Sequence, residues 1–313
     1  MKRYNNLYEN MYKLENIEKV FREICRNTKN KSKVYRFKEY KCLNITRIYN
    51  TLKERKYIPG PYNRFIIYEP KKRYIVSQGM MDKAVNHLVS RYILIPSITK
   101  CLIDSNVASR LNKGTSEGLK IYKEYVRKCN LKYKDYYVLK CDISKFFYNI
   151  DHDILKEKLK RKIKDKDALK IVFDIIDSEE HGLGIGNMTS QLLAIYYLND
   201  MDHYIKEELK IKYYLRYQDD FLLFHKSKEY LKECLILITD FLKKEKLVLN
   251  KKTRIYKNTN KFIYLGRVSN GRYARYRTIK RKIKKRRYLY QINHLNLNGI
   301  ASTIICYKNL DKI

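Results

Sequence analysis

The spacing of apolar residues along the chain switches between a helical and a strand period. Amphipathic helices are predicted where apolar residues recur at every third or fourth position. Four segments have this spacing, namely residues 7–25, 82–96, 188–209 and 228–246. Two short apolar runs, residues 64–68 and 73–77, lie on either side of a turn-like Glu69-Pro70-Lys71-Lys72 and predict a β-hairpin.

The middle of the chain predicts a sheet. Residues 137–141 form a short apolar run that stops at Asp142, as a buried strand would. Residues 212–217 and 221–224 are two further strand-like runs, and the polar residues 218–220 between them predict a hairpin with carboxylates at its tip. The order strand, helix, hairpin, helix predicts an α+β fold with the helices on one face of the sheet.

Composition and charge narrow the class of protein. A chain of 313 residues with 44% hydrophobic residues can bury a sizeable core, and only 10 glycines and 4 prolines favour a helix-rich fold. Lysine and arginine number 69 against 33 acidic residues, a formal net charge of +36. An AT-rich coding sequence would enrich lysine, but it would not keep glutamate low. Self-repulsion of this size therefore indicates a polyanionic partner, with nucleic acid favoured over a membrane surface.

The cysteines and the N-terminus indicate a cellular compartment. Seven cysteines occur singly without a CxxC pair, which argues against a structural zinc site and fits a reducing environment. The first residues contain no apolar stretch typical of a signal peptide, and no window approaches the roughly 18 apolar residues that span a bilayer. We therefore expect a cytoplasmic protein with no membrane partner.

Three aspartates are the candidate catalytic residues. Asp219 and Asp220 are adjacent at the predicted hairpin tip, where like charges repel unless a cation compensates them. Asp142, at the end of another predicted strand, could complete a site for magnesium, which prefers oxygen ligands. A pair of such ions about 4 Å apart activates a 3′-hydroxyl and stabilises pyrophosphate. Seen alone, the Asp219-Asp220 pair is more simply explained as a polar turn than as a metal site. Other motifs in the sequence are needed to distinguish the two explanations.

Several motifs together resemble those of the reverse transcriptase family, from about residue 60 to residue 268. Residues 217–220 (YQDD) resemble the YxDD box, and residues 140–147 (KCDISKFF) are similar to the box with the first metal aspartate. The resemblance implies that two Mg²⁺ ions are bound by the three aspartates and by the backbone carbonyl of Ile143. It also implies that Phe147 is the aromatic steric gate, which excludes a ribose 2′-hydroxyl.

The same resemblance implies nucleotide and primer sites. Residues 70–76 (PKKRYIV) resemble the fingers motif that grips the incoming triphosphate, residues 104–110 (DSNVASR) the next box, and residues 182–191 (GLGIGNMTSQ) the box beside the nucleotide. The nucleotide-binding residues would be Lys72, Arg73, Arg110, Phe147, Ile185, Gly186 and Gln191. Residues 262–266 (FIYLG) resemble the primer grip, which would be formed by Tyr264, Leu265 and Gly266.

The implied fold is the right-hand polymerase of fingers, palm and thumb, with an antiparallel palm sheet packed on helices. An N-terminal segment and the fingers would occupy residues 1–136, and the palm residues 137–268, with some fingers elements around residues 155–182. Residues 269–313 would form a basic thumb, because residues 272–287 hold ten basic residues and no acidic one. The implied activity is RNA-directed DNA polymerisation, a nucleotidyl transfer that uses an RNA template, a DNA or RNA primer and deoxynucleoside triphosphates.

The box beside the nucleotide departs from the common family pattern. Ile185 stands where most members have glutamine, and Ser190-Gln191 stands where they have Ser-Pro. This pattern resembles the enzymes of diversity-generating retroelements, which copy a template RNA with frequent errors at adenines and work with a small basic accessory protein. An isoleucine offers shape but no polar contact, so we expect nucleotide discrimination to loosen.

Other members of the family fit the sequence less well. A group II intron enzyme needs a maturase region, for which the segment after Gly266 is too short, and the Val-Thr-Gly box of retron enzymes is missing. No feature of the sequence argues against a defence-associated reverse transcriptase, which stays an alternative. The alternative outside enzymes is a non-catalytic RNA-binding relic of the fold. Against it stands the complete set of Asp142, Asp219, Asp220, Phe147 and Arg73.

Overall fold

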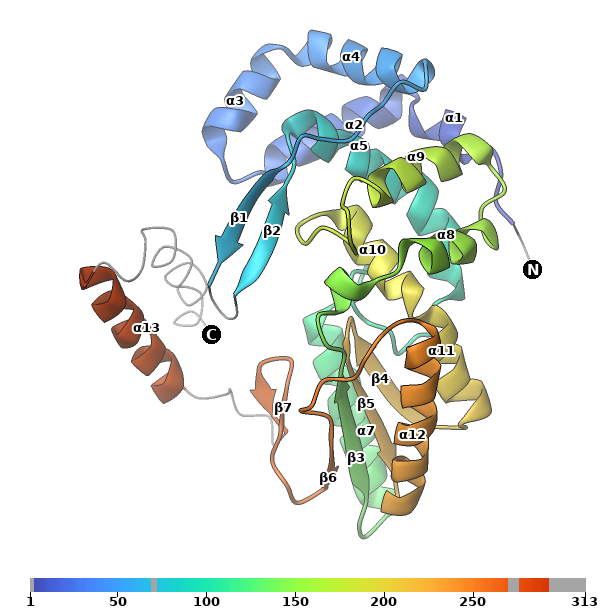
Figure 1. Cartoon of the computed structure of the whole chain (residues 1–313), viewed down its shortest axis with the longest axis vertical. Helices are drawn as coiled ribbons and strands as arrows, with labels where there is room; N and C mark the ends of the chain where they lie inside the picture. Colours follow the sequence, from blue (N-terminus) through green and yellow to red (C-terminus); the bar gives the residue numbers. More distant parts are fainter. Residues whose placement is uncertain (1–2, 69–71, 270–275, 293–313) are drawn as a thin grey trace. The chain divides into compact units, whose positions relative to one another are not determined.

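A computed structural model describes residues 3–68, 72–269 and 276–292 (Figure 1). These residues belong to two compact units. The first unit lies within residues 1–61 and 78–260, and the second within residues 62–77 and 261–313. Helices and antiparallel strands both contribute, so the predicted α+β class is confirmed.

The first unit begins with a group of helices packed through their apolar faces. The helix predicted over residues 7–25 is two helices, because Lys13 between them is extended with ψ 135°. The predicted helix over residues 82–96 starts earlier and passes through a π-helical turn at Ser90–Leu94. The helices of this group are α1 (Leu7–Met11), α2 (Leu14–Asn27), α3 (Lys31–Glu39), α4 (Lys41–Lys53), α5 (Met80–Val89) and α6 (Ile95–Ile98).

A four-stranded antiparallel sheet forms the other part of the first unit. Its strand order is β4 (Tyr213–Tyr217), β5 (Asp220–His225), β3 (Tyr137–Asp142) and β6 (Arg254–Lys257). The predicted strand and hairpin are therefore present. Tyr217 pairs with Asp220 across the tight turn, and Asp142 pairs with Asp220 between the neighbouring strands. This register brings the ends of β3 and β5 side by side.

Helices cover both faces of the sheet, so the prediction that they lie on one face was wrong. Tyr122 and Tyr125 of α7 (Thr115–Lys132) contact Phe224 with ring centroids 6.0 Å apart. Leu223, which points the opposite way along β5, belongs to the core that also contains Leu231 of α12 (Lys228–Lys244). Figure 1 shows α7 behind the sheet and α12 in front of it. The continuous apolar run of β5 is explained by burial on both faces.

The remaining helices of the first unit connect the helical group to the sheet. The predicted helix over residues 188–209 consists of three pieces, α10, α11 and a π-helical turn at Tyr204–Glu208. It is interrupted after Tyr197, where Leu198 leaves the helical conformation with ψ 8°. The bounds in this region are α8 (His152–Lys160), α9 (Lys166–Ile176), α10 (Met188–Tyr197) and α11 (Asn199–His203), with 3₁₀ turns at Thr99–Cys101 and Phe146–Asn149.

The second unit contains two hairpins and a helix. The hairpin predicted from the two apolar runs is present as β1 (Asn63–Ile67) and β2 (Arg73–Ser77), and β7 (Ile263–Tyr264) pairs with β8 (Arg267–Val268). Helix α13 (Tyr276–Gln291) falls in the basic stretch. The other parts of the predicted thumb, residues 270–275 and 293–313, lie outside the described residues. Among the described helices, none combines the length and the apolar character needed to cross a bilayer.

Candidate active site

The three candidate aspartates meet where β3 ends and β5 begins. Asp142 and Asp220 are direct cross-strand partners, so their side chains project from the same face of the sheet. Asp219 precedes Asp220 in the turn, and its backbone carbonyl accepts a hydrogen bond from the Ile143 amide at 3.3 Å. After Asp142, Ile143 forms an antiparallel bridge with Leu249. The hydrogen bonds of this bridge are made by the Asp142 carbonyl and the Ser144 amide, and the Ile143 carbonyl takes no part in them. The structure thus brings together all four predicted metal-binding residues.

The electrostatics of the site are set by the burial of Asp220. The pKa of its carboxyl group is raised to about 6, chiefly by burial and in smaller part by the neighbouring Asp142 and Asp219, while Lys140 lowers it. The Lys140 ammonium lies 2.5 Å from the Asp220 carboxylate. Lys140 was not among the site residues predicted from the sequence. Its position two residues before Asp142 on the same strand, and therefore on the same face, was the available signal.

The donors at this site are of the chemical type that magnesium binds. Three carboxylates and a backbone carbonyl are the oxygen ligands that Mg²⁺ prefers. Among the described residues, no three acidic, histidine or cysteine side chains already stand in ligating geometry. Lys140 instead provides the positive charge beside Asp220. Burial keeps the pKa of Asp220 raised although Lys140 lowers it, and a divalent cation bound there would favour the charged carboxylate.

A chain of hydrogen bonds ties the turn to the predicted nucleotide box. The Gln218 Nε2 donates to Ser109 Oγ at 2.9 Å, and Ser109 Oγ donates to Gln191 Oε1 at 3.1 Å. Gln218 has a left-handed backbone with φ 55°, which is costly for a residue other than glycine. The turn that carries Asp219 is therefore fixed from one side by Gln191.

A buried ion pair also holds the same turn, through the backbone carbonyl of Gln218. Arg216 of β4 and Asp202 of α11 are both fully buried, and the Arg216 Nη1 donates to the Gln218 carbonyl at 3.0 Å. Neither residue was singled out from the sequence. A charged residue inside the otherwise aromatic and apolar strand Tyr213–Tyr217 was the signal that could have identified Arg216.

The backbone of Phe147 packs closely against Gly182, the first residue of the nucleotide box. The Leu183 amide donates to the Phe147 carbonyl at 2.7 Å. A Cβ atom at Gly182, which has φ +64°, would lie 2.2 Å from the same carbonyl oxygen. Ile185 and Gly186 share a turn, in which Ile185 is half-buried and Gly186 is exposed. The predicted gate residue and the predicted nucleotide box are thus adjacent through their backbones.

Arg110 is engaged with its own loop. Its Nη1 donates to the carbonyls of Ile103 and Asn106 at 2.7 and 2.9 Å. Burial lowers the pKa of its guanidinium, and Asp104 and Asp202 counteract this. Its predicted contact with the nucleotide stays a prediction.

The remaining predicted residues belong to the second unit. Lys72 and Arg73 are exposed on the β1–β2 hairpin, and the Lys72 ammonium lies 5.8 Å from the centroid of the Tyr74 ring. Tyr264 is buried, and the next two residues form the turn between β7 and β8 with φ 47° and 76°. Their predicted roles at the triphosphate and the primer also stay predictions.

Comparison with known proteins identifies the family. The sequence profile of the family described as "Reverse transcriptase (RNA-dependent DNA polymerase)" matches residues 69–268, more than half of the chain. The chain belongs to the reverse transcriptase family. The matched region contains the three aspartates, Phe147 and the nucleotide box of this reverse transcriptase. No curated protein matches the chain.

A solved structure of telomerase shares the fold of this chain. Telomerase from Candida albicans, in complex with a fragment of telomeric RNA, has a TM-score of 0.53 at 14% sequence identity, over 80% of this chain and 55% of that chain. Apo telomerase from Candida tropicalis, truncated from its C-terminal domain, has a TM-score of 0.49 at 16% identity, over 66% and 52% of the two chains. The reverse transcriptase therefore spans about half the length of these telomerase chains.

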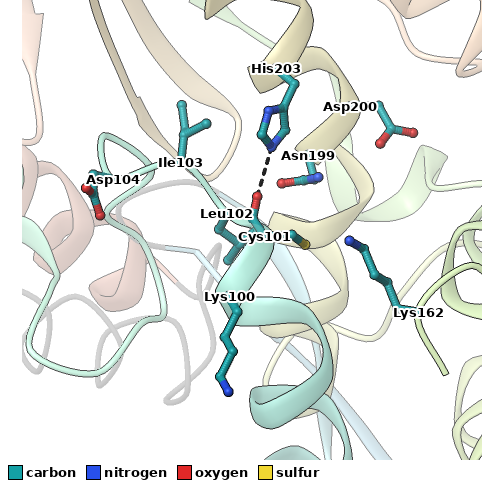
Figure 2. A pocket seen from close by; sticks show the side chains of 9 residues that line it. All are labelled: Lys100, Cys101, Leu102, Ile103, Asp104, Lys162, Asn199, Asp200 and His203. Carbon is teal, nitrogen blue, oxygen red and sulfur yellow. Dashed lines mark hydrogen bonds between the residues drawn. The ribbon is translucent and has the colours of Figure 1, made fainter. Parts of the chain in front are cut away.

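The first unit also contains a cavity that is separate from the three aspartates. It has a volume of about 760 Å³, and its wall includes Cys101, Lys162, Asn199 and His203 (Figure 2). The His203 Nε2 lies 2.9 Å from the Cys101 carbonyl, which joins two sides of the wall. Asp104, which begins the DSNVASR motif, is among its lining residues, but none of the predicted catalytic or nucleotide-binding residues contributes to it.

The raised pKa of Asp220 predicts that the metal-free reverse transcriptase gains stability from Asp220→Asn. The folded pKa of about 6 exceeds the usual 3.8, so the carboxyl group destabilises the fold once it ionises. The free energy of unfolding of the wild type therefore falls as pH rises from 3.8 to about 6. At higher pH the total decrease is up to about 3 kcal/mol, because each pKa unit corresponds to about 1.4 kcal/mol. Chemical unfolding in EDTA over a pH series measures the effect.

The matched control for this prediction is Asp240→Asn, which neutralises an exposed helical aspartate paired with Lys243. Its effect should be small and should not grow between the two pKa values. Magnesium should then stabilise the wild type but not the Asp220 variant. A variant that is no more stable than the wild type in EDTA at mildly alkaline pH would show that Asp220 is not under electrostatic strain.

The close approach at Gly182 predicts that Gly182→Ala lowers the free energy of unfolding by about 2–3 kcal/mol. An alanine would combine an unfavourable left-handed backbone with a clash against backbone atoms of Phe147 and Tyr148. Gly266→Ala is the matched control, since Gly266 has a similar φ of +76° but nothing within 4 Å of the added Cβ. The control should cost about 1 kcal/mol. Equal losses in the two variants would contradict the proposed close packing.

Proposed function

We propose that this reverse transcriptase copies an RNA template into DNA at a two-magnesium site formed by Asp142, Asp219, Asp220 and the Ile143 carbonyl. The observation that carries the proposal is the direct pairing of Asp142 with Asp220 beside Asp219. Bound magnesium would supply activation of the primer 3′-hydroxyl and neutralisation of the pyrophosphate. The substrates would be an RNA template, a DNA or RNA primer and deoxynucleoside triphosphates.

The other residues have roles that follow from their chemistry. The Phe147 ring would exclude a ribose 2′-hydroxyl, and the buried pair behind Gln218 would keep Asp219 in place. Lys72 and Arg73 would bind the triphosphate, and Arg110, Ile185, Gly186 and Gln191 would line the nucleotide site. Tyr264, Leu265 and Gly266 would position the primer end. The basic residues of α13 would neutralise phosphates of the hybrid duplex, as expected of a thumb.

A primer-extension assay tests the proposal. The full chain is incubated with a primed RNA template and deoxynucleotides, with magnesium or with EDTA. We expect extension only with magnesium, and much weaker extension with ribonucleotides because of Phe147. Binding of the primed template without any extension would reject the polymerase and support a non-catalytic relic of the fold.

We also propose that the enzyme is the error-prone type found in diversity-generating retroelements. The support is the departure at Ile185 and Ser190-Gln191. The half-buried Ile185 side chain offers no hydrogen bond to a nucleotide. Matched and mismatched nucleotides would therefore differ little in their binding free energy at this position. A small basic accessory protein would then be a further partner.

Ile185→Gln is expected to lower misincorporation opposite template adenine by about fivefold, the value of one net hydrogen bond. Sequencing of the products from an adenine-rich RNA template gives the error rate. Ile185→Leu is the control, because it changes shape without adding a polar group. An unchanged error spectrum in the glutamine variant would argue against a role of Ile185 in fidelity.

A further inference from the structure

A groove lies between α3 and α4, two helices that precede the region matched by the family profile, and Gly79 and Met80 at the start of α5 complete its wall. It has a volume of about 770 Å³, and α3 and α4 follow each other at one end of the first unit (Figure 1). None of the residues assigned to the polymerase site lines it. The groove therefore needs an explanation of its own.

All charged side chains that line the groove are positive. Lys33, Arg36 and Arg47 line it and are exposed, and no acidic side chain is among the lining residues. Within the described part of the chain, none of these three cations forms an ion pair. The whole of α4 contains no acidic residue. Unpaired cations in a concave site attract an anionic ligand.

The groove also has an aromatic and apolar component. The Tyr40 side chain is 55% exposed and Leu43 is 47% exposed, although both line the groove beside the cations. Exposed rings next to cations suit a single-stranded nucleic acid, whose bases stack on the ring while its phosphates meet the charges. A membrane fits less well, because a flat lipid surface cannot reach the floor of a concave groove.

We propose that this groove binds a segment of single-stranded RNA outside the polymerase site. The choice of RNA over DNA rests on the proposed function, in which RNA is the strand that is present before synthesis begins. The binding itself rests only on the three cations and on Tyr40. A duplex would bind poorly, since its bases are stacked internally and cannot reach the ring.

The test measures binding of a fluorescently labelled oligouridylate to the full chain over a series of salt concentrations. The combined variant Lys33→Gln, Arg36→Gln, Arg47→Gln is expected to lower the slope of log affinity against log salt by about 2, because each contact on a single strand contributes about 0.7. Tyr40→Ala is expected to weaken binding about tenfold with an unchanged slope. The control replaces three exposed lysines of α12, namely Lys228→Gln, Lys232→Gln and Lys244→Gln.

An unchanged slope in the groove variant, or an equal change in the α12 control, would overturn the proposal. Equally strong, groove-dependent binding of oligothymidylate or of duplex RNA would overturn the assignment to single-stranded RNA. Thermal melting of each variant ensures that the folded protein is compared. Primer extension by the wild-type chain is measured separately. If the wild type binds oligouridylate through the groove but extends no primer, the groove proposal stands and the polymerase proposal fails.

Discussion

Asp219→Asn is expected to lower nucleotide incorporation at least about 1000-fold, which corresponds to about 4 kcal/mol of transition-state stabilisation. The amide has the shape of the carboxylate but carries no charge, so it would hold magnesium poorly. Asp219 is half-buried in a turn where Gln218 is held by Ser109 through its side chain and by Arg216 through its carbonyl. The fold should therefore survive the substitution, and the loss should be confined to chemistry.

Single-turnover extension of a primed RNA template measures this loss. Asp142→Asn should behave in the same way, because Asp142 stands directly opposite Asp220. Asp240→Asn, which changes an exposed aspartate of α12, should keep full activity. Template binding should stay close to wild type in all three proteins. Activity of the Asp219 variant within tenfold of wild type would remove this residue from the catalytic site.

The part of the site that the sequence predicted depends on short-range patterns. A buried strand ending at Asp142, and two strands around Gln218-Asp219, follow from apolar runs interrupted by polar residues. Because a tight turn leaves little freedom of register, Tyr217 must pair with Asp220. The additional pairing with Asp142 joins strands that lie far apart in the sequence, and only the family resemblance made that contact predictable.

The features that the sequence did not predict depend on long-range packing. The α7 helix covers the second face of the sheet through Tyr122 and Tyr125, although nothing in its own sequence specifies which face it will meet. The interruption of the helix over residues 188–209 likewise has no proline or glycine as a local signal. Tertiary packing decided both features over local propensity.

The buried pair Arg216–Asp202 is the clearest case of such long-range dependence. The guanidinium donates to both carboxylate oxygens, with Nε 2.6 Å from Oδ1, and also to the Ile195 carbonyl at 2.9 Å. The Tyr214 hydroxyl donates to the same carboxylate at 2.7 Å. Burial opposes the charge of Arg216, but Asp202 outweighs it and raises the pKa of the guanidinium. The pair is therefore stable only as a complete, fully hydrogen-bonded network.

Arg216→Met is expected to lower the free energy of unfolding by about 3–5 kcal/mol, because it leaves the Asp202 carboxylate buried without a counter-ion. Chemical denaturation measures the loss. Asp174→Ala, which breaks the more exposed pair of Asp174 with Lys170, is the control and should cost below about 0.5 kcal/mol.

The double variant Asp202→Asn, Arg216→Met separates stability from function. Removing both charges should recover much of the lost stability, since no uncompensated ion remains. Polymerase activity should stay low, because the Gln218 carbonyl has lost the Arg216 donor that fixes the turn before Asp219. A double variant as unstable as Arg216→Met would show that hydrogen bonding, rather than charge, dominates the network. Full activity in a stable double variant would show that the turn holds Asp219 in place without help from Arg216.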